Sequence, residues 1–201
     1  GTNWSNDGGR PQSQVRGASI YQDFELPKQV LIEFQISWKQ VATAEGKADP
    51  DFLFAVCVDN QPDSTQRAFR FEVWDGTLVA VAESERDSDV AFIQAIEGES
   101  GTVRLQAFVD QANQKMLLYS HQGEQLGILQ VSSKTPHVGT GIRLLNKNGQ
   151  VRLDSLRISQ WNGAPPRNVQ ADKSRLHLSS GEIVYGTIDG YDAQQQELTV
   201  T

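Results

Sequence analysis

A strict alternation of apolar and polar residues in the first fifth of the chain most constrains its fold. The even positions from 30 to 38 hold Val, Ile, Phe, Ile and Trp, and the odd positions between them are polar apart from Leu31. Successive side chains of a β-strand point to opposite faces, so this segment predicts a strand with one buried face. Trp38 is therefore expected in the core.

The same two-residue period returns further along the chain. It occurs in Phe69–Val73, in Val90, Phe92 and Ile96, in Val103–Val109, and in Met116 and Leu118. Turn-forming pairs such as Asp75-Gly76 and Asn148-Gly149 separate these segments, and no long stretch has a helical apolar stripe. The chain is therefore predicted to be all-β and antiparallel, with about ten to twelve strands between Ala18 and Trp161. So many strands bury their apolar faces best as two stacked sheets, a β-sandwich.

Three segments follow from the pattern. Residues 1–161 are predicted to form the sandwich, with a bulge near Asp154-Ser155 where the apolar phase changes, and with Trp4 and Trp161 near its two ends. Residues 162–168 contain two prolines and predict a linker. Residues 169–201 alternate again, but they are too few for a core of their own. They either pack on the sandwich as a short β appendage or begin a second small β domain.

Charge and cysteine content exclude several classes of function. The 201 residues carry a formal net charge of -7 with 18 Lys and Arg, so nucleic acid is not an expected partner. No apolar run is long enough to insert into a membrane. Cys57 is the single cysteine and can form neither an intrachain disulfide nor a thiolate zinc site. Its apolar surroundings predict a small buried side chain.

Three stretches together resemble the concanavalin A-like lectin/glucanase superfamily: Tyr21–Leu26, Ile32–Trp38 and Gly149–Ile158. The resemblance covers residues 18–161 and is strongest to the laminin G-like jelly roll and to the 3-keto-glycoside hydrolase type. It implies a two-sheet antiparallel jelly-roll sandwich. It also implies a glycan ligand and an extracellular or cell-envelope (periplasmic) location in an exported bacterial protein. The appendage resembles the first hairpins of a truncated small β-barrel, through Leu178–Glu182 and Gly186.

Catalytic motifs are mostly missing. The Glu-x-Asp-x-x-Glu strand of the superfamily's glucanases does not occur, which favours a non-catalytic protein. The segment from Phe71 to Asp75 is similar to a strand of the 3-keto-glycoside hydrolase type. In that alternative Glu72 is a catalytic acid, with Asp75 as its less certain companion.

Five residues are candidates for a sugar-binding surface, because flat aromatic rings stack on sugars while polar side chains bind the hydroxyl groups. They point away from the predicted core face of their strands, and they would line one surface if those strands share a sheet. They are Arg70, Glu72, Trp74, Arg104 and Tyr119.

Acidic residues suggest calcium as the one possible cofactor. Asp87 and Asp89 belong to a run in which acids occupy every second position, and Asp59 and Asp63 flank a short loop. The alternative for each is a solvated turn. The sequence therefore leaves three hypotheses: a carbohydrate-binding module, a glycoside hydrolase using Glu72, and a structural domain that contacts another protein domain.

Overall fold

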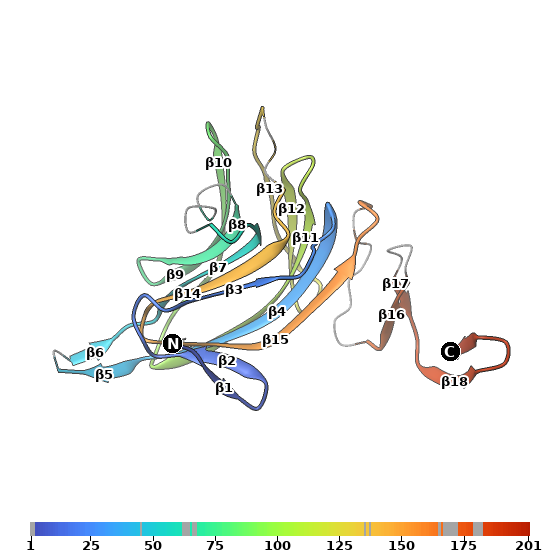
Figure 1. Ribbon diagram of the computed structural model, residues 1–201, viewed down its shortest axis with the longest axis horizontal. Helices are drawn as coiled ribbons and strands as arrows, with labels where there is room; N and C mark the ends of the chain where they lie inside the picture. The colour runs from blue at the N-terminus through green and yellow to red at the C-terminus, as the bar shows by residue number, and fades with distance from the viewer. Residues whose placement is uncertain are drawn as a thin grey trace.

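The computed structural model describes residues 3–44, 46–61, 65, 68–134, 136, 138–164, 166, 173–178 and 183–201. Two antiparallel sheets dominate them (Figure 1). Sheet A has the order β1 (Ser5–Asp7), β2 (Arg10–Ser13), β15 (Gln150–Gln160), β4 (Gln29–Lys39), β11 (Ser100–Asp110), β12 (Lys115–Ser120) and β13 (Gln125–Gln130). Sheet B has the order β10 (Ser88–Ala95), β9 (Thr77–Glu83), β8 (Phe69–Trp74), β7 (Asp51–Val58), β14 (Gly141–Asn148) and β3 (Ser19–Asp23).

Three hairpins lie outside these sheets. They are β5 (Val41–Thr43) with β6 (Gly46–Ala48), β16 (Arg175–His177) with β17 (Ile183–Tyr185), and β18 (Ile188–Asp192) with β19 (Glu197–Val200). Every regular element among the described residues is thus a strand, apart from the 3-10 geometry at Thr65. The architecture is the predicted jelly-roll sandwich. Among the same residues there is no helix with the length and apolarity that crossing a membrane requires.

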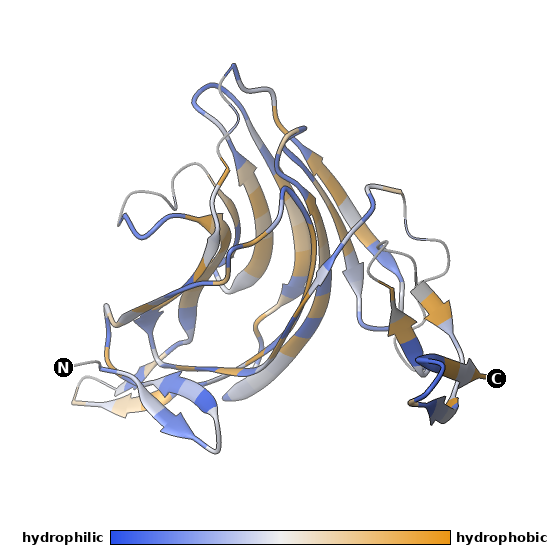
Figure 2. Ribbon diagram, turned by 45° about the vertical axis from the view of Figure 1, so that its right-hand side comes forward, coloured by the Kyte–Doolittle hydropathy of each residue, from blue (hydrophilic) through white to orange (hydrophobic). Residues whose placement is uncertain are grey.

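The alternation of apolar and polar residues in β4 reflects the burial of one face of the strand. Val30, Ile32, Phe34, Ile36 and Trp38 are all buried between the sheets, and the same alternating bands colour the long strands in Figure 2. Phe34 contacts the rings of Phe54 and Phe71 from sheet B, with centroids 4.6 and 4.8 Å apart. Burial of these faces away from water is the main stabilisation of the two-layer fold.

Two bulges change the phase of a strand. In β15 the register with β4 shifts between Leu153 and Ser155, which confirms the predicted bulge at Asp154-Ser155. In β7 the register shifts around Cys57, which has a positive φ of 58°. The thiol of Cys57 packs in the core, as the sequence predicted.

Strand β10 corrects one interpretation of the pattern. Val90 and Phe92 pair with Val81 and Val79 on the outer face of sheet B, and Phe92 is 74% exposed. Ala91 packs against the core instead. The sequence grouped Val90 and Phe92 with Ile96 on one face because all three are at even positions. The register shifts after Phe92, so residues before and after this bulge do not share a face by even or odd position.

Trp4 and Trp161, the tryptophans near the two ends of the sandwich sequence, pack in different clusters. Trp4 packs against the main core between the sheets, whereas Trp161 covers the outer face of sheet A. Trp161 is held there by residues of the predicted linker, because its Nε1 donates a hydrogen bond of 2.8 Å to the carbonyl of Ala164. The appendage reaches sheet A through an ion pair between Arg175 and Glu33.

Candidate functional site

Strand β8 places alternate side chains on opposite faces of sheet B. Phe69 and Phe71 are buried in the core, and Arg70, Glu72 and Trp74 lie on the outer face. The sequence therefore predicted the orientation of these three correctly.

Glu72 is held in an ion-pair network rather than in an open cleft. It is 7% exposed, its Oε1 accepts a hydrogen bond from Nε of Arg70 at 2.9 Å, and its Oε2 accepts one from Nζ of Lys147 at 3.1 Å. Arg70 also pairs with Glu83 at 2.5 Å, and Lys147 with Asp51 at 3.8 Å. Both oxygens of Glu72 are thus occupied by cations.

The pKa values of this network follow from burial and charge. Burial acts to raise the pKa of Glu72, but the hydrogen bonds from Arg70 and Lys147 outweigh it and hold the pKa below the usual value. Burial raises the pKa of Asp51, partly offset by Lys147. A general acid for glycoside cleavage needs a raised pKa and a free proton, so the surroundings of Glu72 suit a structural ion pair.

Trp74 is the last residue of β8, and a polar hollow lies near this end of the strand. Its side chain is 42% exposed, and Asp75 and Gly76 form the following tight turn with positive φ angles of 45° and 73°. Val73 and Asp75, the two sequence neighbours of Trp74, line a hollow of about 650 Å³ at this end of the sandwich, whereas the Trp74 side chain points to the opposite face of the strand. Apart from Gly76 of the same turn, the other lining residues come from distant loops and strand ends: Arg16, Gln40, Asp49, Pro50, Asp51, Ile96, Gly98, Lys147 and Asn148. The sequence singled out Asp75 here, but no local pattern links it to the other polar residues.

Arg104 and Tyr119 lie elsewhere. They belong to β11 and β12 of sheet A, so the five predicted residues are divided between the two outer faces of the sandwich. Tyr119 is only 7% exposed, because it packs with Phe108, Leu117 and Trp161. The condition that these strands share a sheet is not met, and Tyr119 offers no stacking surface.

The acidic calcium candidates bond to the backbone. Asp89 Oδ2 accepts a hydrogen bond from the amide of Gln130 at 3.0 Å, and Asp87 Oδ2 accepts one from Ser132 at 3.3 Å. Asp59 accepts a hydrogen bond on its carbonyl oxygen from Arg143, and Asp63 lies outside the described residues. Within the described ranges, no three His, Cys, Asp or Glu side chains gather as ligands for a metal ion.

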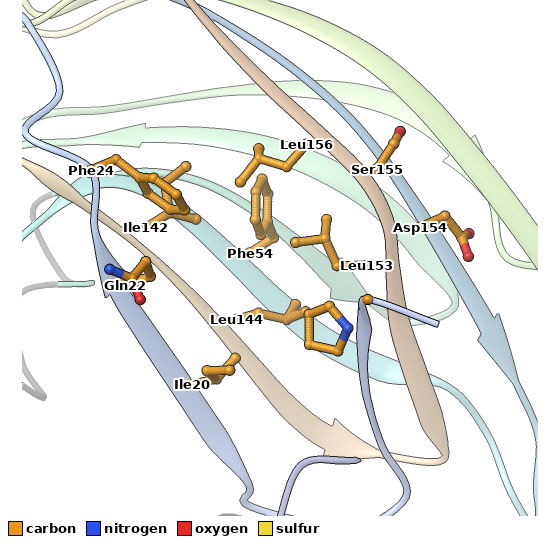
Figure 3. Close-up of a pocket in the computed structure, with 12 residues that line it drawn as sticks. Ile20, Gln22, Phe24, Phe54, Ile142, Leu144, Leu153, Asp154, Ser155 and Leu156 are labelled. Atoms are coloured by element: carbon orange, nitrogen blue, oxygen red, sulfur yellow. The ribbon is translucent and has the colours of Figure 1, made fainter. Parts of the chain in front are cut away.

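An apolar cleft of about 420 Å³ opens between the sheets, at the edge where β3 faces β15 (Figure 3). Phe54, Ile142 and Leu144 line it from sheet B, and Leu153 and Leu156 line it from β15. Phe24 is 40% exposed at its mouth. The lining suits apolar groups, whereas sugar hydroxyls need more hydrogen-bond partners than it offers.

Comparison with known proteins identifies similar folds but no family and no close relative. No family model matches the chain, and no curated protein matches it. Among solved structures, a sialidase is similar at a TM-score of 0.54 and 13% identity, over 78% of this chain and 16% of that one. A legume lectin-like domain from Entamoeba histolytica is similar at 0.50 and 8% identity, over 78% and 86%. The receptor binding domain of a botulinum neurotoxin C/D mosaic serotype is similar at 0.55 and 8% identity, over 77% and 40%.

These similarities establish the fold. The chain has the two-sheet antiparallel jelly-roll fold, the architecture that the sequence resemblance implied. The matched region is a minor part of the sialidase and of the neurotoxin domain, and it spans most of the lectin-like domain.

Proposed function

We propose that this protein is a non-catalytic carbohydrate-recognition module that binds its ligand at the exposed ring of Trp74, on the outer face of sheet B. The observation that carries the proposal is the exposed ring of Trp74 at the end of β8, next in sequence to Asp75, which lines a polar hollow. An exposed indole stacks on the apolar face of a sugar, and carboxylate, amide and ammonium groups bind its hydroxyls.

The fold supports this proposal at a general level, because a lectin-like domain shares it. The paired state of Glu72 supports recognition over hydrolysis. Glycans for such a module are displayed outside the cell, so we place the protein in the extracellular space or the cell envelope.

A glycan array tests the proposal with the purified chain, with and without calcium, against three variants. Trp74→Ala is expected to weaken binding about tenfold or more, since a stacked ring contributes about 1.4 kcal/mol. Trp74→Phe keeps a stacking ring and should retain most of the affinity. Phe92→Ala removes another exposed ring from the same sheet and should leave binding unchanged.

Two outcomes would overturn the proposal. If the chain binds no glycan, the sandwich is better explained as an interaction domain for another protein. If glycans bind equally to the chain and to Trp74→Ala, the surface at Trp74 is not the site.

A further inference from the structure

A second groove crosses the outer face of sheet A, on the opposite side of the sandwich from Trp74. Gln35 of β4 pairs with Arg104 of β11 and with Ser155 of β15, so these outward side chains lie in one row. Lys173 and Ser174, which directly precede β16, also line the groove. Strand β16 lies beyond β15 in Figure 1. The hollow has a volume of about 550 Å³ and is lined by Glu33, Phe34, Arg104, Ser155, Leu156, Arg157, Lys173, Ser174 and Arg175.

This hollow is cationic in an otherwise acidic protein. Arg104, Arg157, Lys173 and Arg175 face one carboxylate, that of Glu33, while the whole chain carries -7. Glu33 already pairs with Arg175 and lies 3.9 Å from Arg157. Within the described residues, the side chains of Arg104 and Lys173 have no ion-pair partner. Clustered like charges repel each other, so an anion bound between them is stabilised.

The groove continues past Arg104 with a different chemistry. Arg104 also lines a second hollow of about 440 Å³, so the two hollows meet at this side chain. The second hollow combines apolar side chains with neutral hydrogen-bonding ones, and Glu124 and His121 lie beside them. The apolar residues are Ile93, Val103, Leu105 and Leu126, and the neutral polar ones are Gln35, Gln94, Thr102, Ser120 and Gln122. Amides and hydroxyls of this kind bind uncharged hydroxyl groups.

We propose that this groove binds an acidic oligosaccharide. Its anionic group, a carboxylate or a sulfate ester, lies between Arg104 and Lys173, and the hydroxyls of the adjoining sugar unit bind the amide and hydroxyl side chains of the second hollow. A guanidinium forms two parallel hydrogen bonds to either oxyanion. The acidic chain as a whole repels polymers of high charge density, which favours a ligand with spaced acidic groups over a nucleic acid.

This site is separate from the surface at Trp74, so the two can be tested independently. Isothermal titration would compare four probes: an oligogalacturonate, the same oligosaccharide with its carboxyls reduced, a sulfated galactan oligosaccharide, and a single-stranded oligonucleotide. The oligogalacturonate or the sulfated probe should bind, and the reduced probe should bind at least about tenfold more weakly. Comparison of the first and third probes identifies the oxyanion.

Variants assign the binding to this groove. Arg104→Gln and Lys173→Gln change exposed side chains outside any ion pair with the described residues, so the fold should be kept. Each should weaken binding of the acidic probe about tenfold, and Trp74→Ala should leave it unchanged. Arg86→Gln, an exposed arginine in the turn after β9, is the matched control. Equal binding of acidic and reduced probes, tighter binding of the oligonucleotide, or full affinity in both groove variants would each overturn the inference.

Discussion

The carboxylate of Asp89 binds the backbone amide of Gln130 at 3.0 Å, across 41 residues of sequence. It is one of three such contacts, because Asp87 accepts from the amide of Ser132 at 3.3 Å and Glu85 from that of Lys134 at 3.1 Å. Acids at every second position thus meet amides at every second position. The acidic run joins the turn after β9 to the segment after β13, where the edges of the two sheets meet.

Asp89→Ala is therefore expected to destabilise the fold by about 1–2 kcal/mol, because the amides of Val90 and Gln130 lose their charged acceptor. Hydrogen exchange should become faster at Gln130 and stay unchanged in β4, at the centre of sheet A. Glu97→Ala changes an exposed acid outside this run and serves as the control. Unchanged exchange at Gln130 would show that the hydrogen bond contributes nothing to the edge.

Calcium is expected to leave the melting temperature unchanged. A ligand stabilises a protein only when it binds the folded state, and Asp87 and Asp89 would have to release backbone amides to bind calcium. Differential scanning calorimetry in millimolar calcium and in EDTA measures this directly. A higher melting temperature in calcium that Asp89→Asn abolishes would contradict the expectation and restore a calcium site here.

The loss of stability in acid should depend on the ionised carboxylate of Glu72. The pKa of Glu72 is lower in the folded state than its ordinary value of about 4.3, so its charged form stabilises the fold above that pH. This stabilisation is lost as the pH falls through the folded-state pKa. Between about pH 6 and about pH 3 the unfolding free energy should fall less for Glu72→Gln than for the natural chain. Urea denaturation at several pH values provides the measurement.

Lys147→Met provides the complementary variant for Glu72. It removes one of the two cations that lower the pKa of Glu72 while burial remains, so that pKa should rise. We expect a loss of about 2 kcal/mol at neutral pH and a weaker dependence on acid. A variant with unchanged stability at neutral pH would mean that solvent replaces the Lys147 contact at no cost.

The sequence was sufficient for the fold and for single strands, but not for the sites. Alternation predicted the buried face of β4, and the change of phase predicted the bulge at Asp154, because both depend on neighbouring residues. Strand order depends on pairings between distant segments, so sequence could not place Trp74 and Tyr119 on different sheets. Burial of Tyr119 likewise depends on Trp161, which is 42 positions further along and has no local signal to indicate it. The hollow lined by Val73 and Asp75 likewise combines residues from six separate parts of the chain.

Cys57 should react with iodoacetamide only when the protein unfolds. Its side chain is buried in the core, and burial raises the pKa of the thiol, so the reactive thiolate is suppressed in the folded state. Labelling should be more than about a hundredfold slower in buffer than in denaturant, since it requires opening of the sandwich. Mass spectrometry over time measures both rates. Similar rates would place the thiol near the surface and contradict its position at the bulge of β7.

Gly139 should tolerate no side chain, because it lies against the backbone of β7. A Cβ built at Gly139 would be 2.3 Å from the carbonyl oxygen of Cys57, and its own amide donates a hydrogen bond of 2.9 Å to Gln111 Oε1. A strand backbone cannot move aside as a side chain does, so Gly139→Ala is expected to destabilise the fold by about 1–3 kcal/mol. Gly190→Ala is the matched control, since a Cβ there meets nothing within 4 Å. Denaturant titration of both variants should show a lower midpoint for Gly139→Ala alone. A midpoint equal to that of Gly190→Ala would mean that β7 and the segment before β14 lie further apart than this structure has them.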